Sequence, residues 1–370
     1  FPPMNLGLPT VAAIAIRSGG NIAAVMLASH HLTFTLLIVA TYLLLRTWIH
    51  RNPAALLAVV SVWMARGSQA TLEWGGFPTV TSVVIGLFAA RLLLQQTRVA
   101  NWRLSLTTGA AIAAIPLIHG VGGGTWLYCA GPWIALAALL QARDKKATLR
   151  ALAISGLSAA AFLLIYRTAG VVDVRADDMD ITRQWQESST TLAEPIWLSA
   201  VGYVRKDTGT FIVLAGWAAL GVLAVRRQWL AVGLLTIAWL MLATVVANSR
   251  WWVLPGSFLL YPERALYWAA PLSAVALALA WRVLTPVAYA RGSSRFAVAA
   301  LGLGLLGLAG YYQNQFYQKI VRQDFVSADG WEALNWAKEN LRPERDYVQT
   351  AYNSTGSFLP AVAQIACTGA

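Results

Sequence analysis

The chain has 370 residues, of which 58% are hydrophobic and only 12% are charged. A soluble domain normally carries about twice that charged fraction, so the composition excludes a large soluble protein and predicts an integral membrane protein. The net charge of +12 comes from basic residues scattered over loops. A nucleic-acid-binding protein clusters them on one face, and no nucleic-acid partner is expected.

Hydropathy and segment length predict an all-α membrane protein with about ten transmembrane helices. Residues 1–20 open on two prolines and are too short to span a bilayer, so we expect an interfacial or re-entrant helix there. The transmembrane domain is expected at 21–311, with a polar outer loop at 167–207. The expected spans are 21–45, two within 54–95, two within 105–140 broken at 119–124, 148–166, 208–225, 229–247, 265–281 and 296–311.

Residues 312–370 predict the start of a water-exposed α/β domain. Residues 327–342 place Trp331, Leu334 and Leu341 on one helical stripe, and residues 347–352 are typical of a strand. An apolar helix is expected after Gly356. Because the chain opens on Phe1 without a signal-peptide pattern and ends just after an apolar run, we expect it to be part of a longer protein.

Charge predicts the orientation of the spans. Basic residues gather in alternate loops, which hold a single acid, Asp144. The positive-inside rule places these loops in the cytoplasm, and loop 167–207 and the tail in the periplasm of a bacterial inner membrane. The irregular polar turns then share the outer face, where a site built over a helical scaffold is expected.

The segment 259–281 carries the main candidate site. A Tyr-Pro turn at Tyr261 leads into Glu263 and Arg264, and an uncharged apolar stretch follows. An Arg beside a helix N-terminus is well placed to bind a phosphate. Arg250 and Trp251 add a second positive charge and a ring. The alternative is an interfacial anchor with an aromatic belt.

Two further turns are candidates for sugar binding. Glu73 can accept hydrogen bonds from hydroxyls while Trp74 stacks on a ring, or the pair can simply form a polar Gly-Pro turn. His119 precedes a glycine-rich run and titrates near neutral pH, so it is a candidate base or ligand. The alternative for His119 is a helix-end residue that meets interfacial water.

The outer loop contains a candidate metal site. Asp177, Asp178 and Asp180 offer oxygen ligands at a spacing that suits Ca²⁺, Mg²⁺ or Mn²⁺. Arg175 and Arg183 flank them, so a solvated loop with its own ion pairs is the alternative. A divalent cation is therefore the only candidate cofactor.

The order of these parts resembles the GT-C superfamily of membrane glycosyltransferases, which use a polyprenyl-phosphate-linked sugar. Phe1-Pro2-Pro3 is similar to the opening of an amphipathic helix in that family's first outer loop. The turn LEWGGFPT at 72–79 resembles the WGGxPT turn of a bacterial GT-C-like group. Residues 261–264 are similar to a late outer-face motif of the group, and 329–341 and 352–363 to the head of its periplasmic domain.

The resemblance implies transfer of a sugar from a polyprenyl-phosphate donor to a glycan, lipid or protein acceptor. Arg264 is carried over as a phosphate ligand and Glu73 as a cavity residue. The family's catalytic Asp precedes the Pro-Pro helix, so the general base is expected upstream of this chain. The alternative is a non-catalytic membrane subunit that binds lipid or partner proteins in a larger complex. A transporter fits less well, because its broken helices and charges gather at mid-membrane.

Overall fold

The computed structural model describes residues 22–65, 77–99, 101–168, 209–251, 265–289, 294–321, 328–342, 347–350 and 366–369. Several candidate residues lie outside these ranges: Glu73, Trp74, Asp177, Asp178, Asp180, Tyr261, Glu263 and Arg264. So do residues 1–20 and nearly all of the loop at 167–207.

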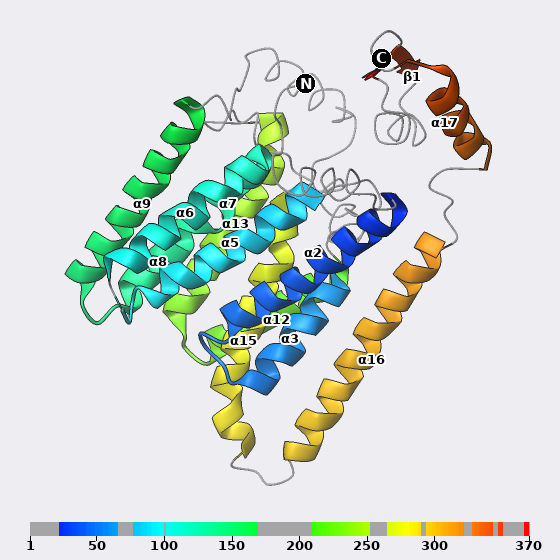
Figure 1. The fold of residues 1–370 in the computed structure, drawn as a ribbon. Helices are drawn as coiled ribbons and strands as arrows, with labels where there is room; N and C mark the ends of the chain where they lie inside the picture. The colour runs from blue at the N-terminus through cyan, green and yellow to red at the C-terminus, as the bar shows by residue number, and fades with distance from the viewer. Residues whose placement is uncertain are drawn as a thin grey trace. The chain divides into compact units, whose positions relative to one another are not determined.

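The described chain is almost entirely helical (Figure 1). Its helices are α2 (Ile22–Leu45), α3 (Arg51–Met64), α5 (Phe77–Gln95), α6 (Trp102–Ile118), α7 (Gly120–Cys129), α8 (Gly131–Gln141), α9 (Lys145–Thr168), α12 (Thr210–Val225), α13 (Trp229–Trp251), the 3₁₀ turn η3 (Leu266–Trp268), α15 (Ala269–Tyr289), α16 (Ser294–Val321) and α17 (Ala328–Asn340). The chain divides into a larger unit, which contains His30–Gln313, and a smaller one, which contains Ala12–Ser29 and Asn314–Ala370.

The helices have the length and hydropathy of membrane spans. In the described ranges, Pro78–Gln95, Gly122–Gln141 and Lys145–Tyr166 are each long and apolar enough to cross a bilayer. Five shorter apolar helices accompany them: His31–Leu45, Trp102–Ile118, Thr210–Val225, Trp229–Val245 and Ala269–Thr285. The chain is thus a helical membrane protein. Three spans meet the length criterion among the described residues, whereas the sequence predicts about ten in all.

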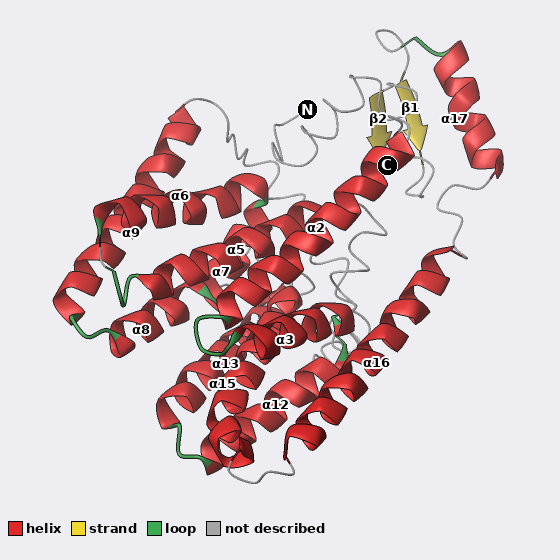
Figure 2. Ribbon diagram, turned by 60° about the horizontal axis from the view of Figure 1, so that its bottom comes forward, coloured by secondary structure: helices red, strands yellow, loops and turns green. Residues whose placement is uncertain are grey.

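Helix α5 lies within the core of the larger unit. It packs against α6, α7 and α8 (Figure 2) and also against η3. Its residues Val80, Val83, Val84 and Leu87 are all at most 4% exposed. A helix that is apolar on every side is expected to be buried on every side, and α5 therefore fixes the positions of the elements around it.

Small residues let α6 and α9 approach closely. A Cβ added at Gly109 would lie 2.7 Å from the carbonyl oxygen of Ser155. At the same interface the amide Nε2 of Gln96 donates to Thr108 Oγ1 at 3.0 Å and to Ser155 Oγ at 2.9 Å. In lipid the hydrophobic effect does not drive helices together, because lipid tails are as apolar as the helix surface. Helices associate there through close packing at small side chains and through interhelical hydrogen bonds.

Three predicted boundaries differ from the structure. The run 119–124 is not a loop: only His119 interrupts the helices, and the glycines after it form the first turns of α7. Helix α13 continues to Trp251, so Arg250 and Trp251 lie in its last turn rather than in a loop. Helix α16 continues to Val321, ten residues beyond the predicted end of the last span at 311.

The smaller unit contains a helix and two strands in its described part. Helix α17 and strand β1 (Tyr347–Thr350) occupy the positions where the sequence predicts a helix and a strand. Strand β2 (Ala366–Gly369) pairs with β1 in parallel, with Tyr347 opposite Ala366 and Thr350 opposite Gly369. The pair is drawn in yellow in Figure 2. The apolar helix expected after Gly356 lies outside the described residues.

Candidate functional site

Helices α5 and α7 begin at the same end of the larger unit and run in the same direction. A Cβ added at Gly122 would overlap the hydroxyl of Ser82, and one turn further on Gly86 faces Trp126. Ser82 Oγ donates a hydrogen bond to the carbonyl of Thr79 at 2.6 Å, and this bond stabilises the first turn of α5. The beginnings of the two helices are therefore in van der Waals contact. These are the helices that follow the turns at 72–76 and at His119.

The chain after Arg264 packs against the middle of α5. Ala265 and Trp268 are 0% and 2% exposed. The rings of Trp268 and Trp126 are tilted at 47° with their centroids 5.6 Å apart. A Cβ added at Gly86 would lie only 2.6 Å from Cη2 of Trp268, so glycine makes room for this ring. The structure thus brings together α5, α7 and η3, the elements that follow three of the candidate turns.

His119 is the residue at which α6 ends and α7 begins. Its Nδ1 accepts a hydrogen bond from the backbone N–H of Gly122 at 3.1 Å, which is the bond of an N-cap. An accepting Nδ1 carries no proton, so the neutral ring holds its proton on Nε2. The side chain is half-buried. Its geometry is that of a helix-end residue, and its contribution to sugar binding remains a prediction.

Helix α13 contacts two of the same elements. It packs against both α7 and η3, and its last turn carries Arg250 and Trp251. In the ranges that the structure describes, no cluster of three or more His, Cys, Asp or Glu residues is found, and the aspartates at 177–180 lie outside those ranges.

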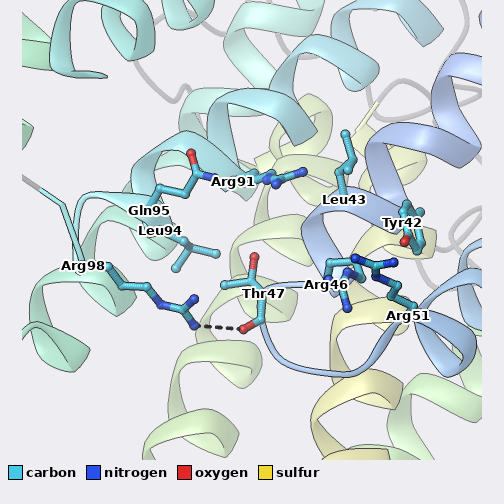
Figure 3. A pocket seen from close by; sticks show the side chains of 9 residues that line it. All are labelled: Tyr42, Leu43, Arg46, Thr47, Arg51, Arg91, Leu94, Gln95 and Arg98. Atoms are coloured by element: carbon cyan, nitrogen blue, oxygen red, sulfur yellow. Dashed lines mark hydrogen bonds between the residues drawn. The ribbon is translucent and has the colours of Figure 1, made fainter. Parts of the chain in front are cut away.

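The opposite end of α5 contains a pocket that the sequence analysis does not predict (Figure 3). It has a volume of about 400 Å³ and is lined in part by Arg46, Arg51, Arg91 and Arg98. The sequence assigns these four residues to loops on one face of the membrane, but linear spacing does not show that the ends of α2 and α5 meet. The signal is the presence of two arginines at or near the end of each of two spans that both line the pocket.

Comparisons with known proteins bear on the fold. No family model and no curated protein matches the sequence. Among solved structures, the chain is similar to the crystal structure of the Archaeoglobus fulgidus oligosaccharyltransferase in complex with Zn and sulfate, with a TM-score of 0.55 and 15% identity. The similarity covers 99% of this chain and 54% of that one, so the chain spans about half the length of that protein. At this identity the likeness shows the fold alone.

Proposed function

We propose that this protein transfers a sugar from a polyprenyl-phosphate donor to an acceptor at the periplasmic face of a bacterial inner membrane. The observation that carries the proposal is the packing of α5, α7 and η3 against one another. These elements directly follow the WGG turn, His119 and Arg264. The likeness to an oligosaccharyltransferase supports a membrane glycosyltransferase built on the same fold.

The proposed reaction exchanges one bond at the anomeric carbon. A carboxylate accepts the proton of the acceptor hydroxyl, whose oxygen then forms a bond to the anomeric carbon. The bond from that carbon to the phosphate oxygen breaks, and the electron pair leaves with the polyprenyl phosphate. Arg264 and Arg250 stabilise the charge that develops on the phosphate. Glu73, Trp74, Glu263 and Trp251 contact the sugar, and Tyr261 contacts the lipid phosphate.

Asp177, Asp178 and Asp180 are the residues that we propose to hold a divalent cation. Their carboxylate oxygens suit Mg²⁺, Mn²⁺ or Ca²⁺ better than the softer Zn²⁺. The oligosaccharyltransferase to which the chain is similar was crystallised with Zn. A bound cation at this loop would add positive charge at the membrane face that receives the phosphate. Loss of donor binding on addition of EDTA, with recovery on addition of Mg²⁺ or Mn²⁺, is the expected result.

The affinity of the protein for a polyprenyl phosphate tests the proposed site. Wild type, Arg264→Lys and Arg264→Ala are compared in nanodiscs, with Arg282→Ala as control, because Arg282 is an exposed Arg in α15. Arg264→Ala removes a charge-assisted contact, so this variant should bind the polyprenyl phosphate roughly 10- to 150-fold more weakly than wild type does. Lysine cannot reproduce a bidentate contact, so Arg264→Lys should restore only part of the affinity.

Two results would count against the proposal in different ways. Equal affinities for all four proteins, with folding intact, would identify Arg264 as an interfacial anchor, since Lys snorkels as well as Arg. Arg264-dependent binding of the lipid without consumption of any polyprenyl-phosphate sugar would instead favour the non-catalytic membrane subunit.

A further inference from the structure

The pocket between the ends of α2 and α5 is lined by four positively charged side chains. Arg46 follows the last residue of α2, Arg51 is the first residue of α3, Arg91 lies on α5 and Arg98 in the turn after it. No described residue that lines the pocket is acidic. Figure 3 shows Arg91 reaching from α5 toward α2, and Arg98 reaching toward Thr47. The volume of about 400 Å³ falls in the range of small-molecule sites, roughly 300–1,000 Å³.

Helix ends do not offset this charge. The C-termini of α2 and α5 each contribute roughly −0.5 charge and the N-terminus of α3 roughly +0.5, so the helix ends together supply about −0.5. Four guanidinium groups supply four full positive charges. Between residues 30 and 313, the described ranges contain one carboxylate, Asp144. Its Oδ1 accepts from the N–H of Ala147 at 2.9 Å, so it caps α9.

The guanidinium groups also retain free donors. Arg98 Nη2 donates to the carbonyl of Thr47 across a long 3.4 Å. Among the described residues, Arg46, Arg51 and Arg91 have no hydrogen-bonded or ion-paired side-chain partner. Arg46 and Arg91 are half-buried, so water satisfies them less fully than it does an exposed Arg. A guanidinium fork matches the oxygens of a phosphoryl group in bidentate fashion.

The pocket is separate from the candidate sugar-transfer site. Helix α5 begins after the candidate turn at 72–76 and ends at the pocket, and its 19 residues span about 28 Å at 1.5 Å per residue. The hydrocarbon core of a bilayer is about 30 Å thick. The beginning of α5 and the pocket are therefore separated by about that thickness.

We propose that this pocket binds a phosphoryl group, carried by an anionic lipid headgroup or by a soluble phosphate ester. A phosphoryl group brings up to two negative charges and three acceptor oxygens, which matches four arginines better than a carboxylate does. The proposal does not depend on the transferase activity, because it rests on the arginines alone.

Two probes distinguish the two sources of the phosphoryl group. Inorganic pyrophosphate is titrated by calorimetry against the full chain in phosphatidylcholine nanodiscs. In parallel, native mass spectrometry counts the phosphatidic acid retained by the full chain from detergent that contains phosphatidic acid and phosphatidylcholine. The variants are the double substitution Arg46→Gln with Arg91→Gln, its lysine counterpart, and Arg150→Gln as control. Arg150 is an exposed basic residue of α9 outside the pocket.

The wild type is expected to bind at least one probe. Binding of pyrophosphate identifies a soluble ligand, and retention of phosphatidic acid alone identifies a lipid. The glutamine pair should weaken that binding at least 10-fold, the lysine pair less, and Arg150→Gln should leave it unchanged. Binding of neither probe, or equal binding by wild type and the glutamine pair, would overturn the proposal. If the glutamine pair does not fold, Arg51→Gln at its exposed position must show the same loss.

Discussion

Trp268 lies against Trp126 with the two ring centroids 5.6 Å apart, and Gly86 of α5 lies beneath both rings. The contact joins α5, α7 and η3. Trp268 is the fourth residue after Arg264, and at 2% exposure it cannot move without opening the core. The chain that directly follows Arg264 is therefore held firmly in the core, as the proposed phosphate-binding role of Arg264 requires.

A methyl group at Gly86 should break this support. Gly86→Ala places a Cβ 2.6 Å from Trp268, and overpacking of a filled core costs about 1–3 kcal/mol. That cost exceeds the roughly 0.5–1 kcal/mol that alanine gains over glycine in a helix. The matched control is Gly221→Ala in α12, where a Cβ meets nothing within 4 Å. Thermal unfolding in detergent should show a lower Tm for Gly86→Ala and an unchanged or higher Tm for Gly221→Ala. Equal shifts in the two variants would mean that the rings relax freely.

The cap formed by His119 can be separated from any direct role in binding. His119→Asn keeps an acceptor for the N–H of Gly122, whereas His119→Ala removes it and should cost about 0.5–2 kcal/mol. Thermal unfolding should therefore rank the stabilities as wild type, then Asn, then Ala. If His119 acts only as a cap, the Asn variant binds a polyprenyl phosphate with wild-type affinity. A folded Asn variant that has lost this affinity would show that the imidazole itself contacts the ligand.

The orientation of the chain follows from its charge and can be measured by cysteine labelling. Lys145→Cys and Arg227→Cys should react with an impermeant maleimide only after the inner membrane is permeabilised, and Asp177→Cys and Ser327→Cys should react before. Cys367 is first replaced by Ser. Cys129 can remain, because its side chain is fully buried in α7. Reaction of Ser327→Cys only after permeabilisation would reverse the predicted orientation.

The sequence predicts the helices well and their contacts poorly. Continuous apolar stretches with basic ends define α2, α5 and α9 nearly to the residue, because chain length and hydropathy alone decide a membrane span. The glycines after His119 are typical of a loop, yet they are helical, because small residues are needed where α7 packs against Ser82 and Pro116. In lipid, tight packing outweighs the low helix propensity of glycine.

The distinction between local sequence pattern and three-dimensional contact also applies to the candidate sugar-transfer site and to the arginine pocket. Local motifs single out Arg264, Glu73 and His119, and the structure shows that the elements after them pack together. The arginine pocket has no local motif. It arises because α2 and α5, which are separated in sequence by α3, end side by side. Only a three-dimensional arrangement shows that Arg46 and Arg91 share one cavity.

A cryo-EM structure of the full chain in nanodiscs with a bound polyprenyl phosphate tests the central claim most directly. The account predicts phosphate density at the end of the unit where α5 and α7 begin, in contact with the guanidinium of Arg264. Density for the phosphate only in the arginine pocket at the other end of α5, or at neither place under saturating lipid, would contradict it.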